Sequence, residues 1–158
     1  MMVLGIDQSL TSTGWCLLLD GDIIEYGIIT SDKNKSNFLR AIDVANEVTE
    51  SKYMFSIEKV VIEGLPFMSR SNVTRDLAGL QFLVYDRLFD YFEEEDIAVV
   101  PPTSLKKFAT GSGKASKEEM FEALSQTEKA KFGKTPKSKG RYDITDAYWL
   151  ARYGEENE

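Results

Sequence analysis

Two short apolar runs that each end in a carboxylate constrain the fold of this 158-residue chain more than any other feature. Residues 2–6 lead to Asp7, and residues 60–62 lead to Glu63. Short apolar runs rich in β-branched residues predict buried strands. A buried carboxylate without a partner is costly, so two acids at strand ends indicate a positive group between them.

A second acidic pair occurs near the end of the chain. Asp143 and Asp146 are three residues apart in a stretch with helical spacing, which places both on one helix face. Hard divalent cations such as Mg²⁺ prefer oxygen ligands and often act on phosphates. The four acids together therefore predict a metal site with phosphodiester chemistry. Taken singly, each acid could equally open a turn, cap a helix or interact with a helix dipole.

The composition excludes several classes of enzyme and site. The chain has no histidine and one cysteine, Cys16, which excludes Ser-His-Asp and Cys-His catalysis and argues against structural zinc. A single thiol in an apolar run, with no signal-peptide pattern, predicts a cytoplasmic protein. No apolar stretch approaches the roughly 20 residues of a membrane span.

The charge is unevenly distributed along the chain. The net charge is −7, yet residues 103–141 contain ten basic and four acidic side chains, a net +6, which leaves −13 elsewhere. A basic surface on an acidic body is typical of a phosphate-binding face. A solvated lysine-rich loop explains the same pattern equally well, and for Lys129 to Lys139 we expect such a mobile loop.

The order of the predicted elements indicates an α/β fold, a mixed five-stranded sheet with helices on both faces, within a single domain over 1–158. The turn at Asp20-Gly21 predicts a hairpin. Asp7 and Glu63 would then lie at the carboxyl ends of neighbouring strands, where α/β sheets place their sites. The predicted strands are 2–7, 13–20, 22–30, 59–63 and 97–100, and the predicted helices are 37–48, 72–93, 116–125 and 142–153.

The long helix predicted over 72–93 has two apolar stripes, one through Leu80 and Val84 and one through Phe82 and Phe89. One stripe is enough for a helix that packs on a sheet. We therefore expect a homodimer through the helix 72–92, because two-fold dimers are the commonest oligomers.

Five segments in order resemble the RuvC-type Holliday junction resolvases of the ribonuclease H-like superfamily. The segments in which the family has its acidic metal ligands are matched by residues 5–15, 61–63 and 143–151. The family's lysine-bearing segment resembles residues 106–117. Its junction wedge resembles Phe67-Met68. The compact sequence is more similar to phage-borne members, for which the compartment would be the host cytoplasm. Gln8-Ser9 replaces the family's usual Pro-Gly after the first Asp.

The resemblance implies a ribonuclease H-like fold and a Mg²⁺-dependent endodeoxyribonuclease that resolves four-way or other branched DNA. Two Mg²⁺ ions per site, replaceable by Mn²⁺, would be held by the four acids. Lys117 would act at the scissile phosphate. The remaining expected DNA contacts are Lys106, Lys107, Lys114, Phe67 and Arg70.

Other readings remain open. A ribonuclease H acting on RNA–DNA hybrid would use a similar acidic set, whereas proofreading exonucleases have a Glu where this chain has Ser9. The sequences of sugar-kinase and actin-like ATPases begin with a similar Asp-containing segment, but these proteins need two such domains to enclose the nucleotide. A non-catalytic relative that binds branched DNA is also possible, although such relatives typically lose acidic ligands.

Overall fold

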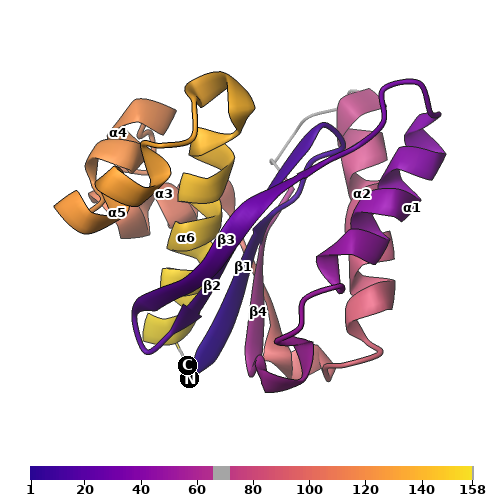
Figure 1. Ribbon diagram of the computed structural model, residues 1–158, viewed down its shortest axis with the longest axis horizontal. Coiled ribbons are helices and arrows are strands. Elements are labelled where there is room, and N and C mark those ends of the chain that lie inside the picture. The colour runs from indigo at the N-terminus through magenta and orange to yellow at the C-terminus, as the bar shows by residue number, and fades with distance from the viewer. Residues whose placement is uncertain (66–71, 158) are drawn as a thin grey trace.

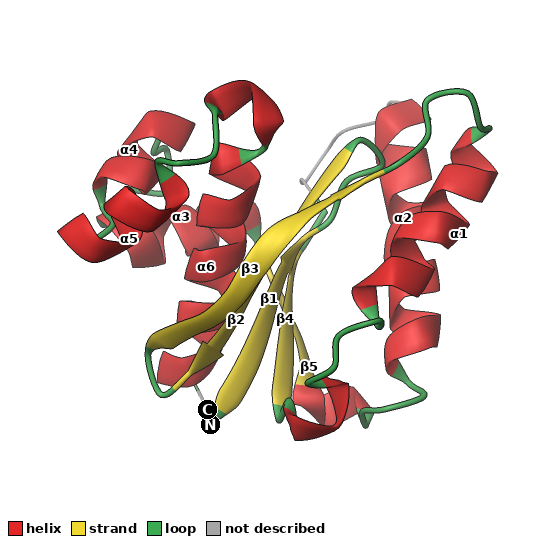
Figure 2. Ribbon diagram, in the orientation of Figure 1, coloured by secondary structure: helices red, strands yellow, loops and turns green. Residues whose placement is uncertain are grey.

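A five-stranded mixed sheet forms the centre of the computed structural model, which describes residues 1–65 and 72–157 (Figures 1 and 2). The strand order is β3-β2-β1-β4-β5. β2 pairs antiparallel with both β1 and β3, while β4 pairs parallel with both β1 and β5. The strands are β1 (Met2–Asp7), β2 (Ser12–Leu19), β3 (Asp22–Thr30), β4 (Lys59–Glu63) and β5 (Ile97–Val100).

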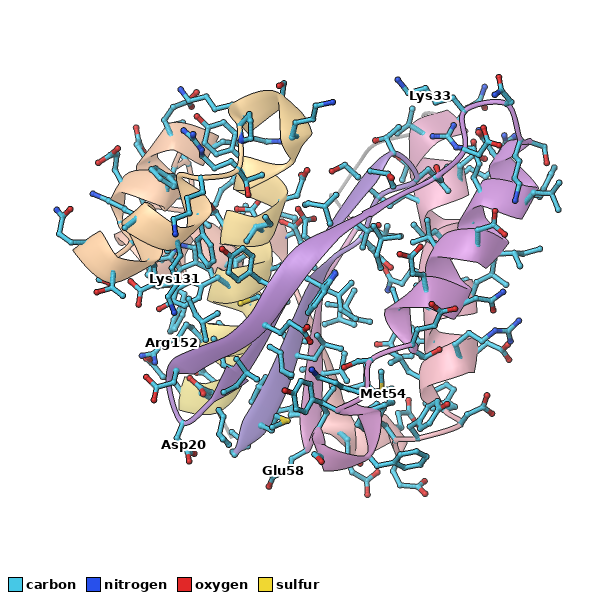
Figure 3. The ribbon with its side chains drawn as sticks, viewed as in Figure 1. Asp20, Lys33, Met54, Glu58, Lys131 and Arg152 are labelled. Carbon is cyan, nitrogen blue, oxygen red and sulfur yellow. The ribbon has the colours of Figure 1, made fainter. Side chains whose placement is uncertain are left out.

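Helices cover both faces of this sheet. α1 and α2 pack on one face, and α6 with α3, α4 and α5 lies on the other (Figure 1). Side chains therefore form two hydrophobic cores, one on each side of the sheet. Met54, for example, lies in the core between the sheet and helices α1 and α2 (Figure 3). The helices are α1 (Asn37–Val48), α2 (Asn72–Leu88), α3 (Pro102–Thr110), α4 (Lys117–Glu122), α5 (Gln126–Phe132) and α6 (Arg141–Glu156).

Local signals explain much of this arrangement. Asp20 and Gly21 both have positive φ, 50° and 88°, as a tight hairpin turn between β2 and β3 requires. Ser116, the first residue of the helix predicted over 116–125, caps α4 through a reciprocal capping box with Glu119. α1 has the predicted bounds. The predicted fold class is therefore confirmed.

Several predictions about helices were wrong; among them, the last helix, predicted over 142–153, extends to Glu156. α2 ends at Leu88 rather than at residue 93, since Glu93 starts a separate short turn with its own capping box. The predicted helix 116–125 ends at Glu122. α3 lies where no helix was predicted, because Pro101-Pro102 directly follows the predicted strand 97–100 and a proline pair can end a strand, yet proline is also favoured at the first position of a helix.

The lysine-rich segment is a further correction, because it does not form a free loop. Residues 126–132 form α5, whose Phe132 is fully buried between the rings of Tyr26 and Tyr148. Lys129 pairs with Glu122 at 2.8 Å. Burial of an aromatic ring stabilises the segment enough to order it although its surface is charged. Among the helices in the described ranges, none has both the length and the apolar character that a bilayer crossing demands.

Candidate active site

Two parallel strands bring the first pair of acids together. Ile6 of β1 lies opposite Ile62 of β4, so that Asp7 and Glu63 leave the sheet side by side at its carboxyl edge. At this edge the two carboxyl groups lie close enough to repel each other, and this repulsion contributes to the raised pKa of Asp7. The predicted juxtaposition of these strand ends is confirmed.

Two glycines allow α6 to deliver the second pair. A Cβ on Gly5 would lie 2.0 Å from the carbonyl oxygen of Ala147, and one on Gly14 would lie 2.2 Å from that of Asp143. Any side chain at these two positions would push α6 away from the sheet. Because neither glycine carries a side chain, the first two turns of α6 lie directly on β1 and β2, beside Asp7.

The four acids line one cavity of about 290 Å³ at the carboxyl edge of the sheet. Lys106 of α3 and Lys117, the first residue of α4, line the same cavity. The cavity therefore joins residues from both ends of the chain. Its acidic members are Asp7, Glu63, Asp143 and Asp146.

Burial and mutual repulsion raise the pKa values of three of these acids. Burial raises the pKa of Asp7 well above its usual value, and repulsion from Glu63, Asp146 and Asp143 adds to this. Burial, followed by repulsion from Glu63, raises the pKa of Asp146 to about 7, against the opposing effect of Lys117. Burial also raises the pKa of Glu63, while its interaction with Asp7 and its proximity to Lys106 and Lys117 lower it. Perturbed pKa values of this kind cluster at functional sites.

The chemistry of the donors fits a hard divalent cation. All four acids offer oxygen ligands, and a cation would relieve the repulsion that raises their pKa values. Within the described ranges, no three acidic, cysteine or histidine side chains are gathered closely enough to hold an ion as they stand. The residues thus fit such an ion in type and location, and their side chains have to approach one another to bind it.

Ser12 is a member of the site that the sequence did not reveal. Its hydroxyl donates a hydrogen bond of 2.7 Å to Oδ2 of Asp143, linking the start of β2 to α6. The available signal was the hydroxyl-rich run that follows Asp7, residues 9–13, which crosses the carboxyl edge of the sheet. Ser9 of the same run lines the cavity.

Two of the remaining predicted DNA contacts, Lys107 and Lys114, lie outside this cavity. Lys107 and Lys114 are exposed on α3 and on the segment that follows it. Neither lines the cavity. Phe67 and Arg70 lie outside the residues that the structure describes.

Comparisons with known proteins support a family assignment. No protein-family model matches the chain. The crossover junction endodeoxyribonuclease RuvC of Synechocystis is 31% identical over 122 residues, which are 74% of this chain and 72% of that protein. The RuvC of Prochlorococcus marinus is 26% identical over 130 residues, 78% of this chain and 79% of that protein.

Solved structures agree on the fold. Thermus thermophilus RuvC in complex with a Holliday junction superposes with a TM-score of 0.72 at 20% identity, over 96% of this chain and 90% of that one. The yeast mitochondrial resolvase Ydc2 superposes with a TM-score of 0.62 at 15% identity, over 98% and 79% of the two chains. With a mixed sheet of the same fold, an acidic cavity at its carboxyl edge and a relative above 30% identity, the chain belongs to the RuvC family of crossover junction endodeoxyribonucleases.

Proposed function

We propose that this chain is a structure-selective endonuclease that resolves four-way DNA junctions by metal-dependent hydrolysis of phosphodiester bonds. The observation that carries the proposal is the single cavity in which four acids from β1, β4 and α6 face two lysines. Family membership supports the choice of junction DNA as substrate. A free, buried Cys16 is consistent with action in the cytoplasm.

The four acids would hold Mg²⁺, in two ions per site, with Mn²⁺ as a substitute. Asp7 lies at the centre of the set, since Glu63, Asp143 and Asp146 all act on its carboxyl group. When bound, such ions lower the pKa of the attacking water and stabilise charge on the phosphate. The role of the acids is to bind and orient the ions at the carboxyl edge of the sheet.

Two lysines supply the positive charge of the protein itself. Lys117 begins α4, and Lys106 projects from α3, so both ammonium groups reach the cavity from rigid helices. Fixed positive charge where a phosphate gains negative charge stabilises a transition state without reorganisation. We assign Lys117 to the scissile phosphate and Lys106 to a neighbouring phosphate. Lys107, Lys114 and Arg70 would contact the DNA farther out, with Phe67 at the junction centre.

A homodimer through α2 would place two such sites on one junction. One stripe of α2 is buried in the core through Leu80, Val84 and Leu88. On the other stripe Phe82 is 78% exposed and Phe89 is 51% exposed. Exposed aromatic residues in a row are typical of interfaces, and two-fold pairing would cover this stripe.

The test compares substrates under identical conditions. End-labelled four-way junction, RNA–DNA hybrid and linear duplex are each incubated with the protein and Mg²⁺, and with EDTA in parallel. We expect paired nicks in opposing strands of the junction alone, and only with Mg²⁺. Cleavage of the hybrid alone would instead identify a ribonuclease H, and junction binding without cleavage would identify a non-catalytic relative.

A further inference from the structure

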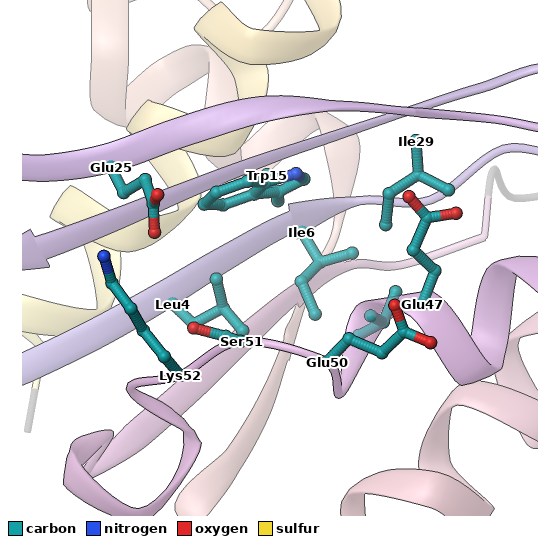
Figure 4. A pocket seen from close by; sticks show the side chains of 10 residues that line it. Leu4, Ile6, Trp15, Glu25, Ile29, Glu47, Glu50, Ser51 and Lys52 are labelled. Carbon is teal, nitrogen blue, oxygen red and sulfur yellow. The ribbon is translucent and has the colours of Figure 1, made fainter.

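A second cavity, of about 340 Å³, lies on the face of the sheet that α1 and α2 cover (Figure 4). This is the face opposite α6, so the cavity is separate from the acidic site. Its floor is apolar and comes from three strands: Leu4, Ile6, Trp15 and Ile29. Its other wall is the end of α1 and the segment 50–52 that follows it. Nothing in the proposed nuclease chemistry uses it.

Three features of the sequence keep this cavity open. Gly27 lies opposite Trp15 in the register of β2 and β3, and a Cβ there would be only 3.0 Å from the indole. The indole therefore lies directly over the strand instead of projecting into the space. Glu25, an exposed acid in place of an apolar side chain, comes two residues earlier on β3. α1 ends at Val48, so the chain crosses the rest of this face as an irregular segment rather than as a helix.

The rim of the cavity carries an excess of negative charge. Among the described residues that line it, three carboxylates, those of Glu25, Glu47 and Glu50, accompany one ammonium group, that of Lys52. In Figure 4 the side chains of Glu25 and Lys52 point toward each other, whereas Glu47 and Glu50 lie together at the other end. Burial, with repulsion from Glu50 and Asp43, raises the pKa of Glu47. A cation at that end would relieve this repulsion.

We propose that this cavity is a binding site for a small amphipathic organic cation. The apolar body of the ligand would lie over Ile6, Trp15 and Ile29, and its ammonium group would lie between Glu47 and Glu50. The volume is in the lower part of the range for sites of small molecules, which are mostly apolar with a few polar groups that orient the ligand.

A matched series of probes tests both parts of the proposal. 4-Phenylbutylamine, 4-phenylbutan-1-ol and 4-phenylbutyrate share one apolar body and differ in charge. Each is titrated into ¹⁵N-labelled full-length protein, and the amide and indole signals are followed by NMR. We expect saturable shifts at the indole N–H of Trp15 and the amides of residues 47–52, strongest for the amine and weakest for the carboxylate. The indole N–H of Trp149, which donates to the carbonyl of Met120 at 3.0 Å, should stay unchanged.

Charge variants separate electrostatic selectivity from simple burial. In the double variant Glu47→Gln/Glu50→Gln, we expect affinity for the amine to fall about fivefold to tenfold, to that of the alcohol. The control Glu94→Gln/Glu95→Gln removes the same charge from exposed positions that do not line the cavity. It should bind the amine like the wild type.

Three results would overturn the proposal: equal affinity for all three probes, an equal loss in the control variant, or no shift at Trp15. Junction cleavage by the same samples reports separately on the nuclease. The cation site does not depend on that activity, so either proposal can fail while the other holds.

Discussion

The hydroxyl of Ser12 donates a hydrogen bond of 2.7 Å to Oδ2 of Asp143, across 131 positions of sequence. The bond joins the first residue of β2 to the first turn of α6, and it leaves Oδ1 of Asp143 for another partner. A hydroxyl in this place fixes the orientation of a carboxylate that we assign to metal binding. Outer partners of this kind tune the affinity of a metal site.

We therefore expect Ser12→Ala to raise the Mg²⁺ concentration for half-maximal junction cleavage by about 10- to 100-fold, with little change in junction binding. A Mg²⁺ titration of initial cleavage rates measures this. Thr11→Ala is the matched control, because Thr11 is an exposed hydroxyl that bonds only Ser9 among the described residues. An unchanged Mg²⁺ requirement in Ser12→Ala would exclude this role.

Gly5→Ala should disturb the contact between β1 and α6. The new methyl would lie 2.0 Å from the carbonyl oxygen of Ala147, so the helix has to move and carry Asp143 and Asp146 with it. We expect a loss of about 1–3 kcal/mol in unfolding free energy, and a fall in cleavage. Gly79→Ala provides the contrast, since among the described residues no atom outside its own helix backbone lies within 4 Å of the added methyl on α2. That variant should gain about 0.5–1 kcal/mol in urea unfolding. Equal stabilities for the two variants would contradict the close approach of α6.

The buried acids should make stability depend on pH. The pKa of Asp146 is about 7 in the folded protein and near 4 when unfolded, so the native state binds more protons between these values. Its contribution to stability is therefore fully present below about pH 4 and is lost as the pH rises toward 7, by about 1.4 kcal/mol per pH unit. The isostere Asp146→Asn should lack this decline in EDTA. Parallel pH profiles of the two proteins would show that Asp146 titrates normally.

Added Mg²⁺ should act in the same window of pH. Because ions bind the ionised acids of the native state, we expect Mg²⁺ to raise the melting temperature of the wild type more at pH 7.5 than at pH 5. Asp146→Asn should show a smaller effect at pH 7.5. Thermal melts with Mg²⁺ or EDTA at the two pH values measure it, and an equal rise at both would argue against binding to the ionised acids.

Dimer formation should depend on the exposed stripe of α2. Phe82→Glu introduces charge at the centre of that stripe, and we expect monomers by light scattering and unpaired nicks in the junction. Phe38→Glu is the matched control, because Phe38 is 83% exposed on α1 and lies outside the stripe. A wild type that is monomeric at all concentrations, or a dimer retained in Phe82→Glu, would rule out this interface.

The strand ends were predictable because their physics is local. An acid that closes an apolar β-branched run has few structural solutions, so Asp7 and Glu63 indicated a shared edge before any coordinates. The helical pair Asp143 and Asp146 was equally visible from its spacing. Contacts between distant segments were not predictable from the sequence. Ser12 contacts Asp143 only because Gly14 lets α6 approach the sheet closely, and no short-range pattern indicates that pairing.

The basic segment shows where composition misleads. Lysine density predicted a free loop over Lys129 to Lys139, yet one buried ring, that of Phe132, orders α5 against Tyr26 and Tyr148. Tertiary burial thus outweighs local charge. α3 was not predicted because proline is an ambiguous local signal: a proline that ends a strand can also begin a helix.

The most direct test of the central proposal is single-turnover cleavage of a labelled four-way junction by the wild type and by Asp7→Asn, with junction binding followed in parallel by gel shift. If the acidic cavity is the metal site, Asp7→Asn binds the junction as tightly as the wild type and produces no paired nicks at any Mg²⁺ concentration. Cleavage by Asp7→Asn at the wild-type rate would place the chemistry elsewhere in the molecule.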